Sequence, residues 1–260
     1  MANKHPCAVL VIVLIQLGPA CIDLDAIRRP HPDAGTTCQP CLKKAACSDT
    51  SRDLPDLVAG LESGCGFIEA RDGRNGGWFT IVKPGESQVN PDTQNFTVFT
   101  PSCEAANGSC YSACISGTIA GPGYPYAGLG IVFHNGALMY DLSRWRGVSF
   151  YVRGSVGSSS MLLFQIPLAA DSMVGVGSGT CTASCNDAYQ IPVPGFTSGA
   201  SHDWERKEVS FASLTQMGYG TPEPWDPSTA ISLQWNVSAA VDTAAGDQFQ
   251  VCVDQVQLLP

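Results

Sequence analysis

The sequence predicts an all-β fold, a two-sheet antiparallel β-sandwich of the jelly-roll type. In residues 148–153 and again in 231–237, every second residue is apolar, which is the pattern of a strand with one buried face. The 27 glycines and 18 prolines favour short strands joined by turns over long helices. Several strands that are each buried on one side indicate antiparallel sheets packed in two layers.

The elements follow from the same pattern, in chain order. A helical turn is expected over residues 53–60, because Asp53 is a good capping residue and Pro55 suits the first turn. A second short helical turn is expected over residues 211–216. The predicted strands, whose number and spacing suit a jelly roll, are residues 77–83, 96–100, 112–119, 126–134, 138–140, 147–153, 161–166, 189–193, 204–211, 231–237 and 248–258.

The aromatic residues divide into core and rim. Indole rings supply much of the buried area in a sandwich, so four tryptophans are predicted to fill the core: Trp78, Trp145, Trp204 and Trp235. Trp225 stands between prolines, and Tyr124 and Tyr126 belong to a loop rich in glycine and proline. We expect these three rings near an exposed rim.

The first 21 residues are typical of an export signal. Lys4 is followed by an apolar stretch over residues 7–17, which is too short to span a bilayer, for which about 20 residues are needed. Residues 17–21 (LGPAC) resemble a bacterial lipobox, so Cys21 is the predicted lipidation site, with cleavage and secretion as the alternative. Residues 22–54 are predicted to be a linker containing Cys and Pro, and residues 55–260 the jelly-roll domain.

The cysteines support an exported, oxidising location. Of the 12 cysteines, ten remain after Cys7 is removed with the signal and Cys21 is assigned to lipid. Cys181 and Cys185 are the easiest local disulfide, and Cys65 meets Cys252 if the first and last strands are neighbours. Two further groups of cysteines are left without assigned pairs. They are Cys103, Cys110 and Cys114 in the domain, and Cys38, Cys41 and Cys47 in the linker. For the linker group, zinc binding together with His31 is the weaker alternative to disulfides.

Charge and missing motifs exclude several classes of protein. The chain has 14 Lys and Arg against 23 Asp and Glu, a net charge of −9, so nothing in it provides the basic footprint that nucleic-acid binding needs. It contains no Gly-x-Ser-x-Gly, His-Glu-x-x-His or phosphate-loop motif. Calcium, neutral glycans or basic proteins suit such a surface better.

The outward residues of the predicted strands carry amides, a guanidinium and an aromatic ring. Amide and guanidinium groups form paired hydrogen bonds to adjacent sugar hydroxyls, and an aromatic ring stacks on the apolar face of a pyranose. If the strands align, one sheet presents a glycan-binding set, for which an ordinary solvated face is the alternative. The set is Tyr151, Arg153, Gln165, Gln234, Asn236 and Gln250, with Tyr126 as a further contact.

A glycoside hydrolase or lyase is a rival interpretation. Such an enzyme needs two carboxylates facing one cleft, and Asp187 with Asp203 are the candidates. Most acidic residues here stand at strand ends or turns, where aspartate is ordinarily a cap or a turn former. A catalytic pair is therefore the less favoured interpretation.

Six motifs in order resemble a known family. They are residues 73–80 (GRNGGWFT), 127–130 (AGLG), 140–143 (YDLS) with 147–150 (GVSF), 185–187 (CND), 211–220 (FASLTQMGYG) and 249–254 (FQVCVD). Together they look like the galactose-binding-like jelly rolls of exported bacterial lipoproteins, similar to family-11 carbohydrate-binding modules and the complex I intermediate-associated fold.

The resemblance implies a β-sandwich with a structural calcium between the first strand region and the last strand, and a glycan cleft on the concave sheet. By position, the implied metal ligands are Glu62, Glu69 and Asp254. The chain departs from the family where Gln255 replaces a second closing aspartate and Cys252 replaces a tryptophan.

The function predicted from these observations is non-catalytic polysaccharide binding by an exported, lipid-anchored or secreted module at the cell surface. Two alternatives stay open, a surface domain for protein–protein interaction or assembly, and the hydrolase or lyase described above. The sugar, the oligomeric state and the full disulfide pattern are not determined by the sequence.

Overall fold

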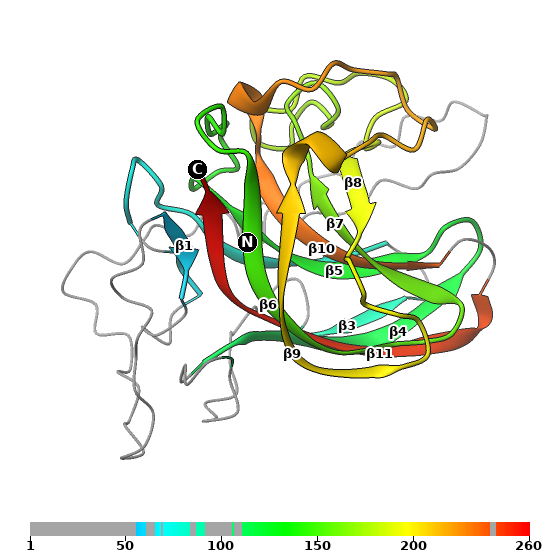
Figure 1. Ribbon diagram of the computed structural model, residues 1–260. Helices are drawn as coiled ribbons and strands as arrows, with labels where there is room; N and C mark the ends of the chain where they lie inside the picture. The colour runs from blue at the N-terminus through cyan, green and yellow to red at the C-terminus, as the bar shows by residue number, and fades with distance from the viewer. Residues whose placement is uncertain are drawn as a thin grey trace, which may run out of the picture.

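The computed structural model describes residues 56–60, 66–68, 70–83, 87–91, 106, 111–239 and 243–260. They form two antiparallel β-sheets packed face to face, so the predicted fold class is confirmed (Figure 1). The loops at the upper end in Figure 1 connect strands of one sheet, called sheet B below, to one another and to the other sheet, called sheet A.

Sheet A contains the last strand at its centre. Its order is β3 (Gln88–Asn90), β4 (Ala113–Gly121), β11 (Thr243–Leu259), β6 (Gly147–Val156) and β9 (Ser201–Ser210), and β1 (Leu57–Ala59) also pairs with β11. A β-bulge interrupts the pairing of β11 with β6 between Asp254 and Gln257, and Gln255 in the bulge has a φ of 46°. Because β11 pairs with β1, β4 and β6, this long strand connects most of the sheet.

Sheet B carries the amide-rich strands. Its order is β2 (Gly77–Val82), β5 (Tyr126–Val132), β10 (Ser232–Ala239), β7 (Ser160–Ile166) and β8 (Tyr189–Pro192), all antiparallel. Two short 3-10 helices, η2 (Phe211–Ser213) and η3 (Pro227–Thr229), lie in the connections at the upper end. Asp226 caps η3 by accepting a hydrogen bond from the N–H of Ser228.

The core lies between the sheets and is centred on Trp235. This ring is fully buried and packs edge-on against Phe150 and Phe164, at centroid distances of 5.1 and 5.5 Å. It also stacks on Trp78 at 5.9 Å. The predicted burial of Trp78, Trp145 and Trp235 is confirmed.

The predictions for Trp204 and Trp225 are wrong. Trp204 is half-buried on the outer face of sheet A, where the guanidinium carbon of Arg153 lies 5.1 Å from the ring centroid. Trp225 is not an exposed rim residue, because it packs against Tyr189 and Phe211 at the margin of the core. Tyr124, in contrast, is exposed as expected.

Most predicted elements are confirmed with small shifts of their ends, two are wrong, and one observed strand was not predicted. Residues 57–59 form strand β1, not a helical turn, because they pair with β11 and the carbonyl of Asp56 accepts the N–H of Leu258. Residues 138–140 form no strand, and Tyr140 makes only an isolated bridge to Ala230. Strand β3 was not predicted, and the strand expected at 96–100 lies outside the described residues.

Two disulfides join described residues. Cys181–Cys185 is confirmed as predicted. Cys252 bonds to Cys114, its directly opposed neighbour in the pairing of β11 with β4, so the expected Cys65–Cys252 bridge is wrong. The remaining cysteines of the predicted clusters lie outside the described part of the chain, as do the signal segment, Cys21 and the linker. Within the described ranges, no helix is both long enough and apolar enough to cross a membrane.

Candidate functional site

The predicted ligand residues lie on two different sheets. Tyr151 and Arg153 are on β6, and Gln250 is on β11, so these three belong to the outer face of sheet A. The residues on sheet B are Gln165 on β7, Gln234 and Asn236 on β10, and Tyr126 on β5. The prediction that one sheet carries the whole set is therefore wrong, because alternation separates inward from outward residues without identifying the sheet.

On the outer face of sheet B, five side chains form a continuous hydrogen-bonded row, which we call the amide ladder. The strand register places Gln234 opposite Gln165, and Gln165 opposite Gln190. Gln165 Nε2 donates to Gln190 Oε1 at 2.7 Å, and Gln234 Nε2 donates to Ser232 Oγ at 2.9 Å. The members of the ladder are Ser232, Gln234, Asn236, Gln165 and Gln190.

Asn236 is the centre of the ladder. Its Nδ2 donates to Gln165 Oε1 at 2.5 Å and to Gln234 Oε1 at 3.2 Å, so both amide hydrogens are used. The side chain is 5% exposed and lies against Gly128, where a Cβ would come within 2.0 Å of Asn236 Oδ1. A glycine at position 128 is therefore needed for Asn236 to occupy this place.

The β2 side of the same face is apolar. Phe79 and Ile81 are buried there together with Val132 and Ile231, and Tyr126 packs against this group. The ring of Phe79 covers Gly130, whose Cβ would approach it to 2.7 Å. The outer face of sheet B thus carries a buried apolar group beside the row of amides, and Tyr126 is the half-buried residue at its edge.

Two tyrosines lie beside the ladder. Burial raises the pKa of Tyr126 to about 12. Burial of the Tyr219 hydroxyl, with Asp187 and Tyr126 nearby, also raises the pKa of Tyr219, and Gln190 is close enough to lower it in part. Tyr219 is nevertheless 54% exposed as a residue, and its hydroxyl is held by the contact described below.

Asp187 holds the loop that carries Tyr219. The carboxylate is 1% exposed and accepts hydrogen bonds from the backbone N–H groups of Met217, Gly218 and Gly220, at 2.9, 2.8 and 3.2 Å. The Tyr219 hydroxyl in turn donates to the carbonyl of Asn186 at 2.6 Å. Asp187 is therefore a positioning residue for the Tyr219 ring.

Sequence reasoning missed Gln190 and Tyr219. Gln190 could have been found, because Tyr189 and Ile191 pack toward the core in a short alternating strand and Gln190 points the other way. Tyr219 could not, because it reaches sheet B from a loop whose course depends on Asp187. The motif at 211–220 contained it without indicating its role.

The carboxylates considered for catalysis do not meet. Asp187 precedes β8 of sheet B, whereas Asp203 is in β9 of sheet A. The acid beside Asp187 is Asp171, which is 3% exposed and accepts hydrogen bonds from the N–H of Leu168 and from Ser172 Oγ. Burial is the main cause that raises the pKa of Asp171 to about 7, with the charges of Asp187 and Glu223 adding to it and the hydrogen bonds from Leu168 and Ser172 opposing it. Both carboxylates are below the surface and hydrogen bonded to loop backbone.

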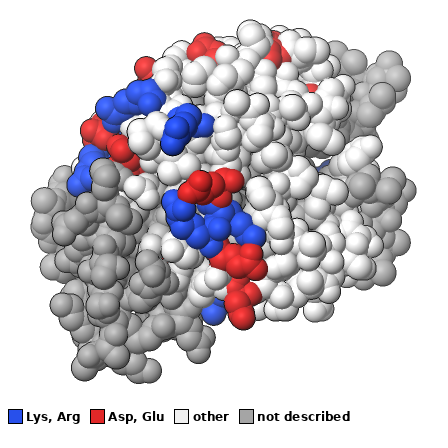
Figure 2. Space-filling view, viewed as in Figure 1, with Lys and Arg blue, Asp and Glu red and all other residues white. Residues whose placement is uncertain are grey.

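The outer face of sheet A is held by charges. Figure 2 shows Lys and Arg side chains bordered by Asp and Glu over β6 and β9, and the ion pair of Arg206 with Glu208 belongs to this region. Tyr151 is half-buried on the neighbouring strand, opposite Arg206. Arg153, the other predicted ligand residue on this strand, covers Trp204 as described above.

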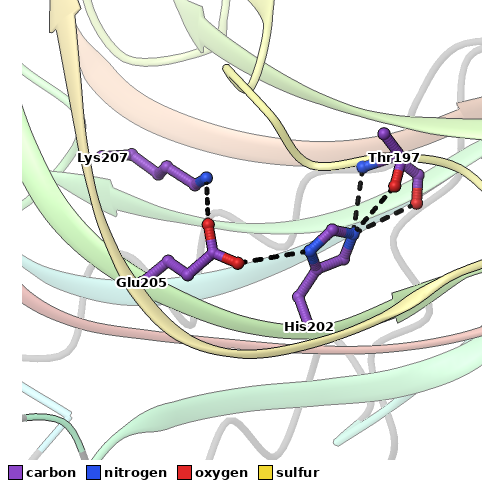
Figure 3. A network of polar contacts seen from close by, with 4 residues as sticks. All are labelled: Thr197, His202, Glu205 and Lys207. Atoms are coloured by element: carbon purple, nitrogen blue, oxygen red, sulfur yellow. Dashed lines mark hydrogen bonds and ion pairs between the residues drawn. The ribbon is translucent and has the colours of Figure 1, made fainter.

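A second polar network fastens the crossover from β8 to β9 (Figure 3). His202 Nε2 interacts with the N–H and hydroxyl of Thr197, at 3.0 and 3.2 Å, and its ring stacks on Phe196 at 4.4 Å. Its Nδ1 lies 3.5 Å from Glu205, which also pairs with Lys207. These contacts tie the strand to the loop, so we assign the network a structural role.

The metal ligands implied by the resemblance are described only in part. Asp254 is fully buried at the bulge of β11, and its Oδ1 accepts the N–H of Gln255 at 2.7 Å. Glu62 and Glu69 lie outside the described residues. Among the residues that are described, no three His, Cys, Asp or Glu side chains gather to hold a metal ion.

Comparisons with known proteins return structures only. No protein-family model matches the sequence, and no curated protein matches it. A family 11 carbohydrate-binding module from Clostridium thermocellum, solved with a β-1,3-1,4-mixed-linked tetrasaccharide, is 17% identical with a TM-score of 0.45, covering 74% of this chain and 94% of that one. A family 30 carbohydrate-binding module of a cellulosomal cellulase from the same organism is 13% identical with a TM-score of 0.43, covering 70% and 90%.

Proposed function

We propose that this protein binds polysaccharide without cleaving it, through the outer face of sheet B. The observation that carries the proposal is the amide ladder, in which four amides and a hydroxyl are fixed in one row across three neighbouring strands. Since the side chains already hold one another in place, little rotamer entropy is lost when a ligand binds.

The ladder retains hydrogen-bonding capacity for a ligand. Gln165 Nε2 and Gln234 Nε2 each donate one hydrogen bond within the ladder, and each carries a second hydrogen. Both side chains are half-buried, so they are reachable from solvent, whereas Asn236 and Gln190 below them are buried. Gln165 and Gln234 are therefore the residues we assign to direct sugar contact.

Aromatic groups supply the second part of the recognition. Tyr219 is exposed on one side of the ladder, and Tyr126, which is half-buried, lies on the other. Sugar rings present apolar C–H faces to such surfaces and hydroxyl edges to amides. An extended chain lying across the strands meets both kinds of group.

Binding is favoured over hydrolysis by the state of the nearby carboxylates. A glycosidase needs an acid and a base or nucleophile on opposite sides of the scissile bond. Asp171 and Asp187 are buried, and their oxygens accept hydrogen bonds from loop groups. Their arrangement supports a structural role.

The test is binding to soluble glucans, xylans and galactans, measured by affinity electrophoresis and calorimetry. We expect at least one ligand, with Gln165→Ala and Gln234→Ala each weakening it about tenfold, or about 1.4 kcal/mol. Tyr151→Ala on sheet A is the matched control and should bind as the unmodified protein does. Failure of every polysaccharide to bind, or release of reducing ends, would contradict the proposal.

Export, lipidation at Cys21 and structural calcium complete the proposed biology. The apolar N-terminal segment and the disulfides support export. The buried carboxylate of Asp254, on the strand that pairs with β1, is the support for a cation there, because calcium takes oxygen ligands with carboxylates among them. Calcium should raise the unfolding temperature and EDTA should lower it, and Asp254→Asn should abolish the difference.

A further inference from the structure

A hollow lies at the upper end of the sandwich, away from the amide ladder. It has a volume of about 690 Å³ and lies between the turn at residues 72–73 and the connection from β5 to β6. Figure 2 shows charges of both signs at the upper left, close to where Figure 1 draws this connection. The volume is in the range of small-molecule sites, and none of its lining residues belongs to the ladder.

The backbone around the hollow is fixed. The carbonyl of Phe133 accepts two hydrogen bonds, from the N–H groups of Asn75 and Gly76, both at 3.0 Å. The N–H of Tyr140 donates to the carbonyl of Ala230 at 2.8 Å. Tyr140 also stacks on Phe133 with ring centroids 4.7 Å apart, so the floor is pinned to the body of the sandwich.

Arg144 is held at the rim by two partners. Its guanidinium carbon lies 3.9 Å from the centroid of the Trp145 ring, and its Nη2 is 2.9 Å from Asp72 Oδ2. The arginine side chain is nevertheless 59% exposed. A guanidinium stacked on an indole and clamped by a carboxylate is preorganised to donate hydrogen bonds to a ligand.

The other polar groups at the rim supply acceptors. Asp72 and Asp141 are carboxylates, and Asp141 is oriented by accepting the N–H of Ser143 at 2.8 Å. Burial lowers the pKa of His134, so at neutral pH its ring offers one donor and one acceptor. A ligand with a full negative charge would be repelled by the carboxylates of Asp72 and Asp141, and one with a full positive charge would be repelled by Arg144.

We propose that this hollow binds a neutral sugar ring at the end of a glycan chain. Sugar hydroxyls donate and accept at once, so neighbouring hydroxyls can bond to a carboxylate and to Arg144 without placing a net charge beside either. The hollow is open to solvent but is bounded by the turn at residues 72–73 and by the connection from β5 to β6, which suits one terminal unit, whereas the longer face of sheet B suits an extended chain. The proposal does not depend on the ladder, since the two sites share no residue.

The experiment uses the whole chain and follows the indole N–H signals of its tryptophans by NMR. Glucose, galactose, mannose, xylose and N-acetylglucosamine are titrated one by one, with inorganic phosphate as the charged probe. We expect at least one sugar to shift the Trp145 signal, and phosphate to leave it in place. Arg144→Ala and Asp141→Asn should each weaken that sugar about tenfold, and Arg144→Lys should restore only part of the affinity.

Two further variants separate this site from the ladder. Tyr151→Ala should change neither site, and Gln234→Ala should reduce polysaccharide binding while the sugar still shifts Trp145. The proposal is overturned if no sugar of the panel shifts Trp145, if phosphate binds there as well as the sugars, or if both Arg144→Ala and Asp141→Asn retain full affinity. Because Asp141 is at the surface, Asp141→Asn tests the site even if an Arg144 variant does not fold.

Discussion

The two outer faces of the sandwich are built by different means. On sheet B the outward side chains are amides that hydrogen bond to one another across β10, β7 and β8. On sheet A they are ion pairs, an arginine over Trp204, and the disulfide Cys114–Cys252 between β4 and β11. Neutral amides can exchange partners with a ligand at little cost, while ion pairs and a covalent bond resist exchange. This difference is the physical reason for proposing that ligand binds on sheet B, while the contacts on sheet A reinforce the fold.

The largest effect is expected from the disulfide on sheet A. Cys114 and Cys252 are 138 residues apart in sequence, and Cys181 and Cys185 only 4 apart. Because stabilisation grows with the length of the closed loop, replacing the first pair by alanine should cost about 5 kcal/mol and the second about 2 kcal/mol. Guanidinium unfolding of the two double variants checks this, and the reverse order would remove the contrast between the faces.

Asn236→Asp breaks the ladder while keeping its shape. The substitution is nearly isosteric, so the contact with Gly128 stays, but a carboxylate cannot donate to Gln165 or Gln234. Leaving two half-buried acceptor oxygens opposite a buried charge should cost about 3 kcal/mol of unfolding free energy at neutral pH. Tyr151→Phe, on the other face, is the control for chemical denaturation. Equal stabilities for the two variants would mean that the ladder is not a cooperative unit.

Asp187→Asn tests whether the loop at 217–220 is positioned for sheet B. An asparagine keeps only one acceptor oxygen where the carboxylate accepts three backbone N–H groups, so we expect a loss of about 2 kcal/mol. Amide hydrogen exchange should quicken at Met217, Gly218 and Gly220, and polysaccharide affinity should fall with it. Unchanged affinity despite faster exchange would separate Tyr219 from the binding face.

The effect that is smallest per step of the experiment is a pH dependence that comes from Asp171. Its pKa is raised by burial from 3.8 to about 7, so between these values the folded protein keeps a proton that the unfolded chain has released. Stability should therefore fall as pH rises through this window, by at most about 1.4 kcal/mol per pH unit. Asp171→Asn should remove this component. Thermal unfolding across the window measures it, and identical slopes for the two proteins would refute the assignment.

Much of the fold could be predicted from the sequence, because alternation is a local property. The strands around Phe150, Trp235 and Val251 have one apolar face whatever sheet they join, and the disulfide Cys181–Cys185 needs only a short turn. The outward orientation of Tyr151, Gln165, Gln234 and Asn236 followed from the same period of two. The short strands β1 and β3 escaped prediction because pairing with β11 and β4, and not their own pattern, makes them strands.

The tertiary structure alone decided which outward residues share a face. The strand order places β7 beside β10 and β6 beside β11, and this order depends on long-range pairing that no local pattern records. Three other contacts depend on long-range pairing in the same way. Cys252 forms a disulfide with Cys114, and Tyr219 lies beside the amide ladder although it belongs to a loop distant in sequence. Arg144 and Asp72 form an ion pair at the rim of the hollow. The sequence by itself determined which side chains of each strand point outward. The packing of the two sheets determined which of these outward side chains lie on the same face and can contact one ligand.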